Sequence, residues 1–150
     1  MFKIFLLILL LNLPSLIWSA PNQEERLKQA ITFSNQGKNE DAIALLISLS
    51  AENSNDYRVF LSLGLIYRGM DKLDEAINAL ERSVQIKPTE DCLYALSLIY
   101  EAMSARLPAE TDRWSAKACA SWNDFLRLNP VDTKRSEVAY RHIRQLQNNP

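Results

Sequence analysis

Apolar side chains recur with the period of an α-helix along most of the chain after its first twenty residues. The stretch 60–88, FLSLGLIYRGMDKLDEAINALERSVQIKP, contains two such runs, separated by a more polar turn at residues 68–72. No run alternates apolar and polar side chains as a strand does, and the chain holds only 3 Gly and 6 Pro. The pattern therefore predicts an all-α protein.

The same order of side chains returns at a fixed interval along the chain. A shift of the sequence against itself by 34 residues aligns several similar side chains. The aligned pairs are Ala30 with Gly64, Phe33 with Tyr67, Ala42 with Ala76, Ile43 with Ile77 and Leu46 with Leu80. A constant period of this length is typical of stacked helix hairpins, in which each hairpin contacts only its neighbours, and not of a helix bundle. The expected architecture is therefore a solenoid.

The second repeat has the clearest pattern, which reads Phe60-x2-Leu63-Gly64-x2-Tyr67, then Ala76-x3-Leu80, then Pro88. This order resembles the tetratricopeptide repeat (TPR) almost position for position. Its physical basis is that the small residues Gly64 and Ala76 allow two antiparallel helices to approach closely, while larger side chains fill the space between hairpins. Pro88 cannot donate a backbone hydrogen bond, and so it ends the second helix.

The resemblance implies an α-solenoid of about three TPR hairpins that is closed by a C-terminal capping helix. The first hairpin has Arg26 and Gln29 where the second has apolar residues, as expected of a terminal repeat that lacks a neighbour on one side. The expected limits are about 23–56, 57–89 and 90–130 for the hairpins and 131–150 for the capping helix and tail.

The third hairpin departs from the pattern because it is longer. Tyr100 and Ala118 are twice as far apart along the chain as the equivalent pair of the second hairpin, Tyr67 and Ala76. The extra residues are expected to lengthen the two helices and the turn, with a new helix starting at Pro108. Trp114 falls in this extension, and we interpret it as a core residue rather than as a binding residue.

His142 is the single histidine of the chain and lies on the apolar stripe of the expected capping helix. Without a second His, a paired Cys or a convergent carboxylate, it has no partner with which to do chemistry. We therefore interpret it as a structural, half-buried residue. The usual motifs of hydrolases, metalloproteases and phosphate-binding loops are also missing from the sequence, so no enzyme activity, cofactor or metal is expected.

Residues 1–19 have the layout of a secretory signal peptide. Lys3 precedes an apolar run that is broken at Asn12 and Pro14, and the expected cleavage point follows Ser19. The uninterrupted run is shorter than the roughly 20 residues of a membrane span, which favours cleavage, with an uncleaved anchor as the alternative. In either case the rest of the chain is expected to be exported, and thus periplasmic or secreted.

The charge balance argues against nucleic-acid binding. The chain has 17 Lys and Arg against 18 Asp and Glu, which gives a net charge of -1. It therefore lacks the basic surface that a phosphate backbone requires. No small-molecule substrate is indicated either, whereas the resemblance to TPR proteins implies the binding of another protein.

Cys92 and Cys119 are the two cysteines of the chain, and an oxidising compartment permits a disulfide between them. Both lie in the expected helices of the third hairpin, where counting back from the turn places them at different levels. Two buried thiols that act as small hydrophobic groups are therefore the favoured interpretation, and a disulfide is the alternative.

In TPR proteins the first helices of the hairpins line the concave side, so the resemblance also implies the positions of a binding groove. At these positions the chain has an apolar strip bordered by charges, which suits the apolar face of a partner helix or an extended peptide. The predicted groove residues are Leu27, Ile31, Arg58, Leu61, Leu65, Arg68, Tyr94, Leu98 and Glu101.

The leading hypothesis is a non-catalytic scaffold or adaptor of the cell envelope that binds a partner peptide or helix in this groove. The alternative is a structural homo-oligomer, such as a homodimer, or an accessory subunit of a secretion or envelope assembly complex, which uses the same strip for self-association. The two hypotheses differ in the expected mass in solution, because a strict monomer with an exposed strip favours a foreign partner.

Overall fold

The computed structural model describes residues 22–148, so the predicted signal peptide at residues 1–19 lies outside the described residues. In the described part the chain folds into seven α-helices and one short 3-10 helix, without strands, which confirms the all-α prediction. The elements are α2 (Gln23–Asn35), α3 (Asn39–Glu52), α4 (Tyr57–Gly69), α5 (Leu73–Ile86), α6 (Glu90–Arg106), η2 (Pro108–Glu110), α7 (Thr111–Arg127) and α8 (Thr133–Asn148).

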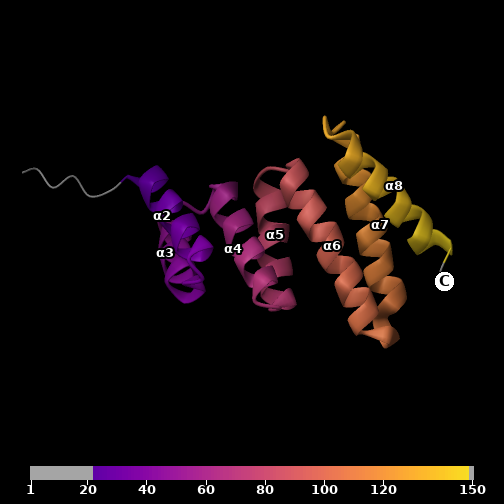
Figure 1. Ribbon diagram of the computed structural model, residues 1–150, viewed down its shortest axis with the longest axis horizontal. Helices are drawn as coiled ribbons and strands as arrows, with labels where there is room; N and C mark the ends of the chain where they lie inside the picture. Colours follow the sequence, from indigo (N-terminus) through magenta and orange to yellow (C-terminus); the bar gives the residue numbers. More distant parts are fainter. Residues whose placement is uncertain (1–21, 149–150) are drawn as a thin grey trace, which may run out of the picture.

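Six of the helices pair into hairpins, α2 with α3, α4 with α5 and α6 with α7. The hairpins follow one another along the long axis of the molecule, and α8 packs on α7 at the C-terminal end (Figure 1). Seven helices are one more than three hairpins contain, and the additional helix is α8. Among the helices of residues 22–148, none combines the length and the hydropathy that a membrane crossing requires.

Short polar and glycine signals set the ends of several helices. Asn22 and Glu25 exchange hydrogen bonds between side chain and backbone N–H at 2.9 and 3.0 Å, which forms a capping box at the start of α2. Asp56 and Thr89 cap α4 and α6 through their side-chain oxygens. Gly37 follows α2 with a φ of 77°, a left-handed conformation that glycine adopts without a steric penalty. The turns are thus set locally.

Gly64 permits the close contact between α4 and α5. A Cβ atom at this position would lie 2.5 Å from Leu80 Cγ and 3.3 Å from the carbonyl oxygen of Ala76. Leu80 and Ala76 are both completely buried, so neither residue has free space to move into. The geometry therefore agrees with the role that the sequence pattern predicts for Gly64 and Ala76.

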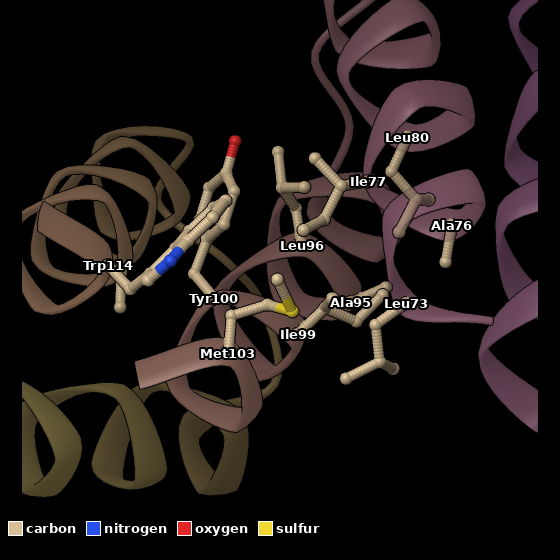
Figure 2. Close-up of a cluster of buried hydrophobic side chains, with 11 residues drawn as sticks. Leu73, Ala76, Ile77, Leu80, Ala95, Leu96, Ile99, Tyr100, Met103 and Trp114 are labelled. Carbon is tan, nitrogen blue, oxygen red and sulfur yellow. The ribbon is translucent and has the colours of Figure 1, made fainter. Parts of the chain in front are cut away.

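Buried apolar side chains form three clusters that follow the order of the hairpins. The first cluster joins α2 and α3 to α4 and α5 around Leu46. The second joins α5 to α6 and α7 around Leu80 and Ile99, as Figure 2 shows. The third joins α6 and α7 to α8 around Trp122 and Phe125. Each hairpin is thus held by its neighbours, which is the packing expected of a solenoid.

The third hairpin is longer than the other two. Helices α6 and α7 have 17 residues each, against 13 or 14 in the helices of the first two hairpins. Pro108 starts the 3-10 helix that precedes α7. Trp114 is 7% exposed, and the centre of its ring lies 5.9 Å from that of Tyr100 (Figure 2). The interpretation of Trp114 as a core residue is confirmed.

Both cysteines are free thiols in the structure, so the alternative of a Cys92–Cys119 disulfide is not realised in it. Cys92 lies in the first turn of α6, with its Sγ atom 2.9 Å from Ser83 Oγ. Cys119 is only half-buried, so the favoured interpretation of two buried thiols is correct for Cys92 and wrong for Cys119. Burial, and to a smaller extent the Glu101 carboxylate, raises the pKa of the Cys119 thiol.

Candidate partner-binding groove

The predicted groove residues come from α2, α4 and α6, the first helices of the three hairpins. The structure divides them into an open part between α2 and α4 and a part on α6 that is covered by side chains of α7 and α8. This division could not be seen in the repeat pattern, which treats equivalent positions of the three hairpins alike.

The open part is a pocket of about 360 Å³ between α2 and α4. Ile31 of α2 and Leu65 of α4 line it and are 43% and 38% exposed. Leu61 also lines it but is half-buried, because it packs against the core cluster of α5, α6 and α7. We call it the α2–α4 pocket, and its lining consists of Ile31, Ser34, Asn35, Leu61, Ser62, Leu65 and Ile66.

The lining includes four residues that are not among the predicted groove residues, Ser34, Asn35, Ser62 and Ile66. One of them had a signal in the sequence, because Ser34 precedes Arg68 by the length of one repeat and therefore stands at the equivalent position of the first repeat. The other three become visible only when the packing of α2 beside α4 is known.

Leu27 does not contribute to the surface of the groove. It is 4% exposed and belongs to the core cluster of the first two hairpins. Because α2 has no preceding hairpin in the described part, its apolar side chains serve mainly to attach it to α3 and α4. Leu27 is therefore a core residue, and a ligand between α2 and α4 would reach Ile31 instead.

Helix α8 covers the groove positions of α6. The ring of Tyr94 packs edge-on against Trp122, with 5.2 Å between the ring centres. The guanidinium of Arg135 lies 5.1 Å from the centre of the Tyr94 ring. Arg135 also forms a 2.7 Å ion pair with Asp91. Leu98 is half-buried against the third core cluster, to which α8 contributes Ala139. Tyr94 and Leu98 are thus occupied within the molecule.

Glu101, the third predicted groove residue on α6, joins α6 to both following helices. Its carboxylate accepts a hydrogen bond from the indole N–H of Trp122 at 2.5 Å and lies 2.6 Å from Nδ1 of His142. The expectation that His142 has no convergent carboxylate is therefore wrong. Glu101 and His142 are 41 residues apart in the sequence, so no local sequence pattern predicts their contact. The half-buried state expected of His142 is confirmed.

Arg58 and Asp56 form a charged group at the start of α4, beside α2. The Arg58 guanidinium donates to Asp56 Oδ2 at 2.8 Å and to Glu24 Oε2 of α2 at 2.6 Å. The Asp56 side chain is only 8% exposed. Hydrogen bonds from the Arg58 guanidinium, opposed by burial and reinforced by the Arg58 backbone N–H, hold the pKa of Asp56 below its usual value. This group ties α2 to α4 at one end of the groove.

An Asp56→Asn substitution is expected to destabilise the protein by about 1–2 kcal/mol near neutral pH, because asparagine can still cap α4 but loses charge-assisted bonds to Arg58. A carboxyl group whose pKa is lowered in the folded state stabilises that state above the unfolded pKa, about 3.9. The stabilisation is lost as the pH falls through the folded pKa. Urea unfolding of both proteins from pH 7 downward should therefore show the difference shrinking below about pH 4.

The matched control for this prediction is Asp41→Asn, because Asp41 is exposed in the first turn of α3 and has no ion pair among residues 22–148. We expect this variant to stay within about 0.5 kcal/mol of the parent. A difference between Asp56→Asn and the parent that persists in acid would contradict the role given to the Asp56 charge.

Known proteins support the same assignment of the repeat. Residues 57–90, which span α4 and α5 and reach the first residue of α6, match the family model of the tetratricopeptide repeat. This segment is a TPR. A search of curated protein sequences found no match. The groove residues Leu61, Leu65 and Arg68 lie within the TPR at 57–90, outside the Phe60–Leu63–Gly64–Tyr67 signature.

Solved structures share the fold over most of the chain. The crystal structure of MamA protein superposes with a TM-score of 0.68 at 23% identity, over 85% of this chain and 63% of MamA, so this chain spans less than two thirds of that protein. The Yersinia enterocolitica type III secretion chaperone SycD, solved in complex with a peptide of the translocator YopD, gives 0.68 at 18% identity, over 83% and 91% of the two chains. Identities this low establish the fold, which is a TPR-like solenoid.

The described solenoid contains no group of three or more His, Cys, Asp or Glu side chains placed to hold a metal ion. The chemical features of its open pocket are instead two exposed aliphatic side chains and a few hydroxyl and amide groups. A pocket of this composition suits a ligand that makes apolar contacts and is oriented by a small number of hydrogen bonds.

Proposed function

We propose that the protein is a non-catalytic interaction scaffold that binds a segment of another protein in the α2–α4 pocket. The observation that carries the proposal is the exposure of Ile31 and Leu65 on two facing helices that enclose about 360 Å³. Aliphatic side chains gathered in a concavity are the usual anchor sites for a partner helix or peptide. The TPR-like fold supports this class of function.

Two further parts of the proposal rest on other observations. The peptide complex of SycD, which has a similar fold, supports a polypeptide partner rather than a small molecule. The layout of residues 1–19 supports export, and hence a scaffold of the cell envelope. Self-association is the second candidate, favoured by the fact that a dimer of SycD has also been solved.

A Leu65→Asp substitution tests the pocket. A charge placed among Ile31 and Leu61 must be desolvated when a partner binds, so we expect the affinity to fall at least about tenfold. Leu65 is a better target than Leu61, because Leu61 also packs against the core and its replacement would destabilise the fold. The measurement is quantitative recovery of crosslinked partners from intact cells that express each variant.

The matched control is Ile47→Asp, which places the same charge at an apolar side chain of α3 that is 51% exposed and outside the pocket. Both variants should keep the thermal unfolding midpoint of the parent within a few degrees, because surface substitutions change stability little. Equal recovery of partners by folded Leu65→Asp and Ile47→Asp would rule out the pocket as the binding site. A mass in solution that drops from dimer to monomer only in Leu65→Asp would establish the second candidate instead.

A further inference from the structure

Arg68 is distinguished from the other charged residues of the groove by its lack of a partner. Arg58 is paired with Asp56 and Glu24, at 2.8 and 2.6 Å. On α6 the acidic groove residue Glu101 is also engaged, since it pairs with His142, and Asp91 at the start of the same helix pairs with Arg135. Arg68 is exposed, and no side chain among residues 22–148 forms an ion pair with it. The described groove therefore has one uncompensated cation.

The position of this cation relates it to the α2–α4 pocket. Arg68 follows Leu65 by three residues on α4, which places it on the same face of the helix, about 4.5 Å further along the axis. Across the groove, Ser34 occupies the equivalent position of α2 and lines the pocket beside Asn35. Arg68 is not itself a lining residue, but its place on α4 puts it beyond Leu65, toward the end of the pocket where α2 and α4 finish.

The pocket itself is small. Its volume of about 360 Å³ is near the lower end of the roughly 300–1,000 Å³ that ligand pockets occupy. The groove positions of α6 cannot extend it, because α8 contacts them. The space suits one or two aliphatic side chains of a partner rather than the whole apolar face of a long helix.

We propose that the bound segment presents one aliphatic side chain to the α2–α4 pocket and one carboxylate, within about one helical turn of it, to Arg68. An arginine guanidinium matches a carboxylate in shape and charge and can donate two parallel hydrogen bonds to it. Asn35 is exposed in the lining of the pocket, so its side-chain amide is available to the backbone of the bound segment. This inference rests on the proposed function and specifies the chemistry of its partner.

A structural role for Arg68 makes a different prediction. Arg68 is in the last turn of α4, where a positive charge also interacts favourably with the helix dipole. In that case its replacement would change the stability of the protein slightly and would leave the preference among ligands unchanged. The experiment must therefore determine which residues the protein prefers in a ligand, as well as the affinity of the ligand.

The experiment selects twelve-residue peptides from a random displayed library on the purified protein and measures the affinity of the winning peptide by fluorescence anisotropy. We expect the selected sequences to share an aliphatic residue with Asp or Glu close by. Arg68→Glu should weaken the winning peptide about three- to tenfold, and a peptide with Lys in place of the acidic residue should bind the variant better than it binds the parent. Arg141→Glu, on the exposed side of α8, is the matched control and should change neither affinity.

The outcomes separate the two levels of the proposal. Selected peptides that require Leu65 but show no acidic residue, or no response to Arg68→Glu, would overturn the carboxylate assignment and leave the pocket in place. A selection that yields no peptide sensitive to Leu65→Asp would overturn the proposed function as well. A photocrosslinker at position 65 that reacts with residues 1–21 of the same chain, or with a second copy, would show that the pocket is already filled and would overturn both.

Discussion

Replacement of Trp122 by alanine is expected to lower the free energy of unfolding by about 3–5 kcal/mol, which is usual for loss of a large aromatic side chain from a core. Trp122 has no exposed surface. Its ring contacts those of Tyr94, Phe125 and His142, and its N–H donates to Glu101. The substitution leaves a cavity where α6, α7 and α8 meet and removes a donor from a half-buried carboxylate. Urea unfolding followed by far-UV circular dichroism measures the loss.

Two further variants divide this effect into its parts. Trp122→Phe keeps most of the packing but removes the hydrogen bond to Glu101, so it should lose about 1–2 kcal/mol. Tyr140→Ala removes an aromatic ring from α8 that is 59% exposed and should change the stability by no more than about 0.5 kcal/mol. If Trp122→Ala were no more destabilising than Tyr140→Ala, the third core cluster would not be what holds α8 in place.

Gly64→Ala is expected to destabilise the protein by about 1–3 kcal/mol through overpacking, even though alanine favours a helix by about 1 kcal/mol over glycine. The added Cβ would lie 2.5 and 2.8 Å from two carbon atoms of Leu80, so α4 and α5 must move apart. Gly69→Ala on the same helix is the control, because a Cβ atom there has nothing within 4 Å. We expect that variant to be neutral or more stable by up to about 1 kcal/mol.

A double-mutant cycle identifies the contact responsible. Leu80→Ala alone should cost about 2–5 kcal/mol, because it leaves a cavity at a completely buried position. The double variant Gly64→Ala, Leu80→Ala should lose at least about 1 kcal/mol less than the sum of the two single variants, since the new methyl group fills space that Leu80 has left. Strict additivity would mean that the Gly64 effect arises elsewhere on α4.

The repeat pattern predicts the part of the fold that depends on local spacing. The pairing of α4 with α5 follows from Gly64, Ala76 and Leu80, because the same two helices contain all the residues in contact. The longer third hairpin follows from the distance between Tyr100 and Ala118 along the chain. These features follow the regular period of the repeat, which makes them visible in a single sequence.

The covering of the groove could not be predicted in the same way. The apolar positions of residues 133–148 indicate that α8 has an apolar face to bury. They do not indicate whether α8 also covers the groove positions of α6. The answer depends on Arg135 and His142, whose acidic partners Asp91 and Glu101 are 44 and 41 residues away in the sequence. Long-range pairs of this kind have no fixed spacing, which is why Tyr94 and Leu98 were expected on an open surface.

The location of the α2–α4 pocket affects how firmly its two walls are held. The α2–α3 hairpin is the first of the described solenoid and packs mainly against α4, whereas α4–α5 is braced by a hairpin on each side. In a stack with nearest-neighbour contacts, the end unit opens at the lowest free energy. A bound segment that touches both Ile31 and Leu65 would hold the end hairpin against the middle one, so binding of the partner would also order the first hairpin.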